Sequence, residues 1–209
     1  ASMSEHYDYD VVIIGAGNVA TVLGRLAQQA GHDILQVISR TADHAHTLAR
    51  ELGCPGSTDF KELDKTAQLV LVALSDGALY DLKDRIHLGD KLVVHTAGSV
   101  SKEVLFDIST HYGVLYPLQT LRAEKKDYAR NIPLLTDGNN AFAREQIRAF
   151  AVSISDQVSP ADDEQRLKLH LAGVVTSNFT NHLYCLAAQY CKEEKLDFSI
   201  LQPLIEETA

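Results

Sequence analysis

The chain has 209 residues, 45% of them hydrophobic and 22% charged, with a formal charge of −9. This is the composition of a globular protein with one sizeable core, so disordered and fibrous classes are excluded. The negative charge is spread along the chain without any basic run, and no apolar run reaches the length of a membrane span. We therefore expect neither nucleic acid nor a membrane as a partner.

Apolar strands alternate with amphipathic helices through about the first 160 residues. The pattern predicts strands at 10–14, 34–39, 69–74, 91–96, 113–118, 132–136 and 152–159, and helices at 18–30, 41–52, 77–85, 101–111 and 139–151. The early strands are continuous Val, Ile and Leu runs, which is typical of strands covered on both faces. The pattern predicts an α/β, Rossmann-type domain over residues 3–160, with a doubly wound and mostly parallel sheet.

An all-α segment is expected over residues 161–209, and it forms the second domain. Its first helix, at about 164–191, carries apolar residues on most sides, so most of its surface must be buried. A second helix begins at about Asp197. Two helices cannot cover so much apolar surface alone. We therefore expect a homodimer built through these C-terminal helices, or further helices beyond Ala209.

Cysteine usage favours a reducing compartment. Cys54, Cys185 and Cys191 have no spacing typical of a disulfide framework or a metal site. Free thiols, together with an acidic N-terminus that is not a signal peptide, favour a cytoplasmic protein. We expect no bound metal, because His44 and His46 stand two apart on an expected helix and point to different sides.

The motif GAGNVA, residues 15–20, follows the first strand and opens the first helix, in the G-x-G-x-x-A pattern of dinucleotide-binding turns. The first glycine permits a tight turn, the second lets a diphosphate approach the backbone, and the alanine lets helix and strand pack closely. The positive end of the helix then faces the phosphates. A glycine turn that merely links strand to helix is the structural alternative. The residues expected to bind the cofactor here are Gly15, Ala16, Gly17, Asn18 and Val19.

The end of the second strand distinguishes the cofactors. FAD- and NAD-binding units commonly place a carboxylate there, whereas this strand ends in Ser39, Arg40 and Thr41, and the first carboxylate is Asp43. A guanidinium makes charge-assisted bonds to a 2′-phosphate. NADP is therefore favoured over FAD and NAD, and a surface role for Arg40 is the alternative.

Two later strand ends complete the predicted cofactor site, because open parallel sheets bind ligands at the carboxyl ends of their strands. Leu74, Ser75 and Asp76 follow one strand, and Thr96 and Ala97 follow the next. Ser75 and Asp76 are expected to contact the ribose on the nicotinamide side, with a helix N-cap as the equal alternative for Asp76.

The motifs GAGNVAxxL, SRT, VALSDGAL, VVHTAGSVS, GVLYPLQTL and LAGVVTSNF follow one another in an order that resembles the NADP oxidoreductases related to pyrroline-5-carboxylate reductase. The resemblance covers nearly the whole chain. It implies an NADP-dependent oxidoreductase with a Rossmann domain, a helical C-terminal domain and a dimer formed through the helices. Tyr116 departs from the pattern, since relatives often carry His before Pro-Leu. The Lys and Asn pair of related β-hydroxyacid dehydrogenases is also not reproduced, because Ala172 stands four residues after Lys168.

His95 and Asn178 are the candidate catalytic residues. Hydride transfer needs chiefly orientation of the nicotinamide, plus a proton donor when a carbonyl is reduced. His95 has the pKa range of a donor, although a histidine that ends a buried strand is more often structural. Asn178 interrupts an apolar run and needs a polar partner, which a substrate would supply. We expect Asn178 to orient the substrate while His95 or a water delivers the proton.

Two classes of function follow from these residues. The first is an enzyme that uses NADPH to reduce a small C=N or C=O substrate. The second is an NADP-binding sensor or scaffold module without turnover. A flavoprotein is a third and weaker alternative. No nucleophile elbow with a serine-histidine-acid order is present, so hydrolase chemistry has no support.

Overall fold

A computed structural model describes residues 8–208 of the chain, so residues 3–7 of the first predicted domain and Ala209 of the second lie outside the described residues. The chain divides into two compact units, with the boundary between Leu167 and Lys168. The predicted boundary, after residue 160, lies earlier in the chain than this observed boundary. The first turn of the long helix belongs to the first unit because the side chain of Arg166 is buried there.

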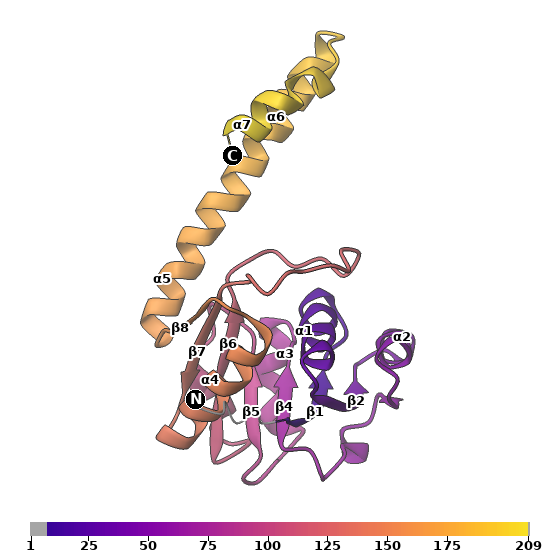
Figure 1. Cartoon of the computed structure of the whole chain (residues 1–209), viewed down its shortest axis with the longest axis vertical. Helices are drawn as coiled ribbons and strands as arrows, with labels where there is room; N and C mark the ends of the chain where they lie inside the picture. The colour runs from indigo at the N-terminus through magenta and orange to yellow at the C-terminus, as the bar shows by residue number, and fades with distance from the viewer. Residues whose placement is uncertain (1–7, 209) are drawn as a thin grey trace, which may run out of the picture. The chain divides into compact units, whose positions relative to one another are not determined.

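The first unit is built on an eight-stranded sheet with the order β3-β2-β1-β4-β5-β6-β7-β8 (Figure 1). The strands from β3 to β6 are parallel, β7 runs antiparallel to β6, and β8 is parallel to β7. The chain leaves β1 toward β2 on one side and returns to β4 on the other, which creates the topological switch point of a Rossmann sheet. The bounds are β1 Asp10–Ile14, β2 Asp33–Ile38, β3 Gly56–Ser57, β4 Leu69–Val72, β5 Leu92–His95, β6 His111–Pro117, β7 Leu134–Gly138 and β8 Val158–Pro160.

Helices cover both faces of this sheet, as the continuous apolar strands predict. Val11 and Ile13 of β1 face the cluster that includes α1 (Asn18–Gln29), α2 (Ala42–Leu52) and α4 (Ala141–Ile154). Val12 and Ile14 face the opposite cluster, which includes α3 (Asp76–Asp81) and short 3₁₀ turns. The predicted doubly wound, mostly parallel α/β fold is therefore confirmed. The 3₁₀ turns are Phe60–Glu62, Leu82–Asp84 and Lys102–Leu105.

The long helical run begins in the first unit and continues through the second. It consists of α5 (Asp163–Val174), a π-helical stretch (Val175–Phe179) and α6 (Thr180–Glu193). A 3₁₀ turn, Phe198–Leu201, and α7, Gln202–Thr208, follow. The predicted helical C-terminal segment is confirmed. Within residues 8–208 no helix is long and apolar enough to cross a membrane.

The helix predicted at 101–111 is wrong, because only Lys102–Leu105 forms a 3₁₀ turn. Long-range hydrogen bonds end this turn early. The Ser109 hydroxyl donates to the carbonyl of Lys91, and the Leu88 amide donates to the carbonyl of Ile108 at 2.7 Å. These bonds draw the segment back to the sheet, where β6 begins.

The strand predicted at 152–159 is largely wrong. Its first three residues belong to α4, because Ile147, Phe150, Ala151 and Ile154 continue one buried helical face. β-branched Val152 and Ile154 raise the strand propensity without changing that periodicity. The short edge strand β3 was not predicted, since two residues carry no periodic pattern.

Candidate functional site

Gly15 makes the tight turn after β1. Its φ is +115°, a region that favours glycine, and its amide donates to the carbonyl of Ile38 at 2.8 Å. A Cβ at this position would lie 2.2 Å from the carbonyl oxygen of Ala73. The turn therefore requires glycine for both conformation and space.

Gly17 is the N-cap of α1 and is exposed, and a Cβ built there would meet nothing within 4 Å. The backbone at this point is therefore open to a ligand. The first turn of α1 carries no acidic residue that would oppose an anion. Ala20 is fully buried, as close packing of helix and strand requires. This cradle has the features that a dinucleotide diphosphate needs.

The loop 118–131 lies against the start of α1, which sequence reasoning did not foresee. The Ala123 amide donates to Oδ1 of Asn18 at 2.9 Å, and Nη1 of Arg25 donates to the Ala123 carbonyl at 2.6 Å. The backbone N–H and C=O of one loop residue, Ala123, are thus both bonded to side chains of α1, and Figure 1 shows the loop between β6 and β7 reaching toward this helix. The Asn18 side chain therefore holds this loop, in addition to its predicted contact with the cofactor.

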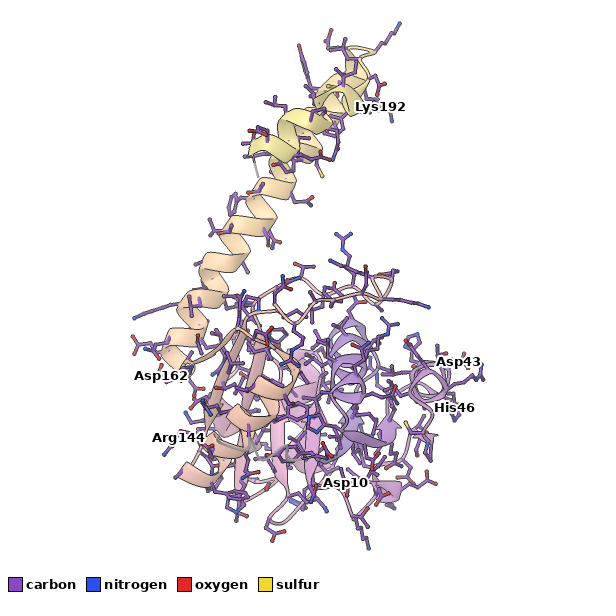
Figure 2. The ribbon with its side chains drawn as sticks, viewed as in Figure 1. Asp10, Asp43, His46, Arg144, Asp162 and Lys192 are labelled. Atoms are coloured by element: carbon purple, nitrogen blue, oxygen red, sulfur yellow. The ribbon has the colours of Figure 1, made fainter. Side chains whose placement is uncertain are left out.

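The end of β2 presents Arg40 to solvent. Its guanidinium makes no hydrogen bond or ion pair with the described residues, while Ser39 is half-buried and donates its amide to the carbonyl of Ser57 at 3.0 Å. Thr41 is the N-cap of α2, but its side chain makes no capping bond. Asp43, the first carboxylate after the strand, lies on α2 (Figure 2). The strand end thus offers a cation and two hydroxyl groups.

Ser75, after β4, is the N-cap of α3, and its hydroxyl accepts from the Ala78 amide at 3.5 Å. The alternative reading of Asp76 as the N-cap is therefore wrong, because Asp76 is the first residue of the helix. Its Oδ2 accepts from the Ser99 hydroxyl at 3.2 Å. This bond joins the loops that follow β4 and β5. Leu74 and Ala97 are half-buried, and Thr96 is buried.

His95 is fully buried at the end of β5, and both of its ring nitrogens have partners. Nε2 lies 3.1 Å from the carbonyl oxygen of Ser101, and Nδ1 accepts from the Ala97 amide at 3.0 Å. Burial lowers the pKa of His95 to about 4; the bond to Ser101 opposes this shift, and the positive charge of Arg166 adds to it. The ring is therefore neutral at physiological pH. This geometry favours the structural alternative over the role of proton donor.

Asn178 lies in the π-helical stretch of the second unit and is exposed. Its Oδ1 accepts from the Ser177 hydroxyl at 3.4 Å. A π-helical stretch within an α-helix frequently accompanies a functional site. Its predicted contact with substrate stays a prediction.

A cluster of charged side chains surrounds the start of α5, and sequence reasoning missed most of it. Lys102 Nζ lies 3.0 Å from Asp137 Oδ2 and 3.8 Å from Asp163 Oδ2. Asp163 also accepts from the Ser101 hydroxyl at 2.5 Å and from Nη2 of Arg166 at 2.7 Å. Burial works to raise the pKa of Asp163, but these hydrogen bonds and the Lys102 charge lower it below its usual range. In the sequence, Asp163 is one of three consecutive acidic residues, 162–164, which suit the start of a helix, and no pattern there indicates these partners.

A glycine turn at the switch point of a parallel sheet, followed by an open helix N-terminus, defines a Rossmann-type dinucleotide-binding domain. Residues 10–98 match the family described as NADP oxidoreductase, coenzyme F420-dependent, and residues 132–209 match a domain of unknown function, DUF2520. A Bacteroides fragilis protein named "putative NADP oxidoreductase" is 39% identical, with a TM-score of 0.87 over 96% of this chain and 79% of its own. The chain belongs to this family of NADP oxidoreductase Rossmann domains joined to DUF2520 domains.

Two further solved structures share the fold. The 1-pyrroline-5-carboxylate reductase of Streptococcus pyogenes is 14% identical, with a TM-score of 0.75 over 96% of this chain and 76% of its own. An imine reductase from Myxococcus stipitatus in complex with NADP⁺ is 19% identical, with a TM-score of 0.70 over 95% and 71%. The family is thus akin in fold to both kinds of reductase. No curated protein matches the chain.

Proposed function

We propose that this protein is an NADPH-dependent reductase that transfers a hydride to a small substrate with a C=N or C=O bond. The observation that carries the cofactor choice is the exposed Arg40 at the end of β2, whose guanidinium has no partner among the described residues. A carboxylate at this strand end would repel a 2′-phosphate, whereas Arg40 attracts it. Family membership supports the oxidoreductase class.

The glycine turn and α1 hold the rest of the cofactor in this proposal. Gly15 shapes the turn, and Gly17 leaves the backbone open for the diphosphate. Asn18 and Val19 begin the helix whose N–H groups face the phosphates, and Ala16 packs against the core beneath them. When bound, NADPH supplies the hydride.

The substrate side uses the loops after β4 and β5 in this proposal. Ser75 and Asp76 bind the nicotinamide ribose, and the small residues after His95 let the nicotinamide approach closely. Asn178 orients the substrate. Because both nitrogens of His95 are occupied, a water is the better proton source.

We further propose a cytoplasmic homodimer assembled through the C-terminal helices. Phe179 and Leu183 are each 63% exposed in the single chain, and many other apolar side chains of α5 and α6 are exposed too. Exposed apolar surface on this scale is typical of an interface. Light scattering of the protein should give twice the chain mass, and replacing Phe179 with Asp should produce monomers. A wild-type monomer at micromolar concentration would contradict the dimer.

The alternative of an NADP-binding sensor without turnover fits one observation equally well. His95 is the histidine placed at a strand end near the expected nicotinamide, and it is neutral and fully hydrogen-bonded. A site without a titrating donor suits binding as well as it suits reduction of an imine, which can enter already protonated.

Turnover with a panel of substrates separates the two functions. We expect NADPH oxidation with at least one member of a panel of cyclic imines, keto acids and aldehydes, with NADH much less effective. Asn178→Ala should lower turnover while NADPH binding persists. Tight NADPH binding without oxidation across the whole panel would instead establish the sensor.

A further inference from the structure

Arg166 is the largest fully buried side chain in the described residues, with 1% of its surface exposed. Its Nη2 donates to the carbonyl of Val100 and to Oδ1 of Asp163, each at 2.7 Å. Its Nε and Nη1 are buried and have no hydrogen-bond partner among the described residues. A guanidinium has five N–H donors, so about three of them are unused.

The acidic partner of Arg166 cannot serve these remaining donors. Oδ1 of Asp163 also accepts from the Lys102 amide at 3.0 Å, and Oδ2 accepts from the Ser101 hydroxyl. Lys102 also pairs with a second carboxylate, that of Asp137. The carboxylate that pairs with Arg166 is therefore already hydrogen-bonded to other donors, the Ser101 hydroxyl and the Lys102 amide.

Unused donors on a buried cation are costly. Each buried unsatisfied polar group costs about 1–3 kcal/mol, and more when it is charged. Apolar side chains of similar volume would fill such a place at least as stably. Each buried unsatisfied group in a native protein therefore calls for an explanation, and a functional role is one.

The place of Arg166 in the fold indicates what that function is. Its charge acts on two side chains at the carboxyl ends of neighbouring parallel strands, His95 of β5 and Tyr116 of β6. Burial raises the pKa of Tyr116, and the Arg166 charge opposes that rise. This edge of an open α/β sheet is where ligands bind.

We infer that Arg166 binds an anionic group of the substrate, a carboxylate, through its Nε and Nη1 donors at the carboxyl ends of β5 and β6. The inference rests on the proposed reductase function and narrows its substrate class to small C=N or C=O compounds that carry a carboxylate. The two bonds to Val100 and Asp163 hold the guanidinium in place. Arg166 is then a binding residue, and Asp163 is the residue that positions it.

Binding of two matched probes tests this inference without turnover. Cyclopentanecarboxylate and cyclopentanecarboxamide have nearly the same shape and differ in charge. We expect the full chain, saturated with NADP⁺, to bind the carboxylate about tenfold to a hundredfold more tightly than the amide in calorimetric titrations. Equal binding of the two probes by the wild type would overturn the inference.

Three variants assign the preference to a residue. Arg166→Met should abolish the carboxylate preference while NADP⁺ affinity is kept. Arg166→Gln, which retains an amide donor for the Val100 carbonyl, gives the same readout if the methionine variant does not fold. Lys102→Met removes the neighbouring cation and should keep the preference. Loss of the preference in Lys102→Met alone, or of NADP⁺ affinity in both Arg166 variants, would contradict the assignment.

The result is separable from the reductase proposal. Carboxylate binding that depends on Arg166, without NADPH oxidation by any substrate, would uphold the anion site and remove the reductase. NADPH oxidation that prefers neutral substrates and is unchanged in Arg166→Gln would uphold the reductase and remove the anion site.

Discussion

The two halves of the sheet's carboxyl edge are built by different means. At β1 and β2 the candidate site consists of backbone features, a glycine turn and an open helix N-terminus, together with one exposed side chain, Arg40. At β5 and β6 side chains make it, and His95 and Arg166 are both fully buried. The first half is open to a ligand as it stands, whereas the polar groups of the second half are buried, and two nitrogens of Arg166 have no hydrogen-bond partner among the described residues.

This difference suits two separate roles: binding of the cofactor at β1 and β2, and selection of the substrate at β5 and β6. The diphosphate is a fixed part of any dinucleotide, so a backbone cradle with fixed N–H groups suits it. In the proposed function the substrate is selected by side chains such as Arg166, because selectivity depends on the chemistry of a site and not on the fold.

Gly15→Ala should destabilise the protein by about 3 kcal/mol or more, because the methyl group meets the Ala73 carbonyl and φ is positive. Thermal unfolding should shift down by about 10 °C, and NADPH binding should be lost. Gly17→Ala is the matched control, since its methyl group meets open space. It should melt like the wild type yet bind NADPH more weakly. Equal melting of both variants would show that the backbone turn is not the constraint.

Acid should lower the free energy of unfolding, because the buried ring of His95 resists protonation in the folded state. The pKa of this ring is lowered from 6.5 to about 4 in the folded state, so the unfolded chain takes up the proton first. The stability is complete above pH 6.5 and is lost as the pH falls toward 4, by about 3 kcal/mol from this group.

Denaturant unfolding at several pH values measures this loss. His95→Asn should flatten the decline between these pH values, whereas His46→Asn, on the exposed side of α2, should leave it unchanged. Parallel pH curves for the wild type and His95→Asn would refute a neutral buried ring.

Arg40→Ala should weaken NADPH binding by about tenfold to a hundredfold, because one or two charge-assisted hydrogen bonds are removed. NADH affinity should stay the same, since NADH lacks the 2′-phosphate. Arg50→Ala removes another exposed cation at the end of α2 and should change neither affinity. If Arg40→Ala binds NADPH as tightly as the wild type does, Arg40 does not select NADP at the end of β2.

Asn18→Ala should release the loop 118–131 at a cost of about 1 kcal/mol, because the Ala123 amide loses its acceptor. Hydrogen exchange of that amide should accelerate. Asn18→Asp keeps the acceptor but places a negative charge at the helix N-terminus. It should preserve slow exchange and weaken NADPH binding. Unchanged exchange in Asn18→Ala would mean that Arg25 alone holds the loop.

Local patterns in the chain were enough to predict the alternating β and α elements, the glycine turn and the cation at Arg40. These features are local: they depend on periodicity, on the conformational freedom of glycine and on which residue ends a strand. The doubly wound sheet follows from them because parallel strands need covering helices on both faces. The helix expected at 101–111 failed where long-range bonds of Ser109 and Leu88 overrode local propensity.

The hydrogen-bond partners of the buried polar groups, in contrast, come from the tertiary fold. The sequence shows His95 as a histidine after a strand, but the fold buries the ring and occupies both nitrogens with backbone groups. Arg166 reads in the sequence as one charged residue in an acidic helix start. In the fold its guanidinium donates to the Val100 carbonyl and to Asp163, and two of its nitrogens have no partner among the described residues. Burial and hydrogen-bond satisfaction depend on residues distant in the chain, so no local pattern of the sequence encodes them.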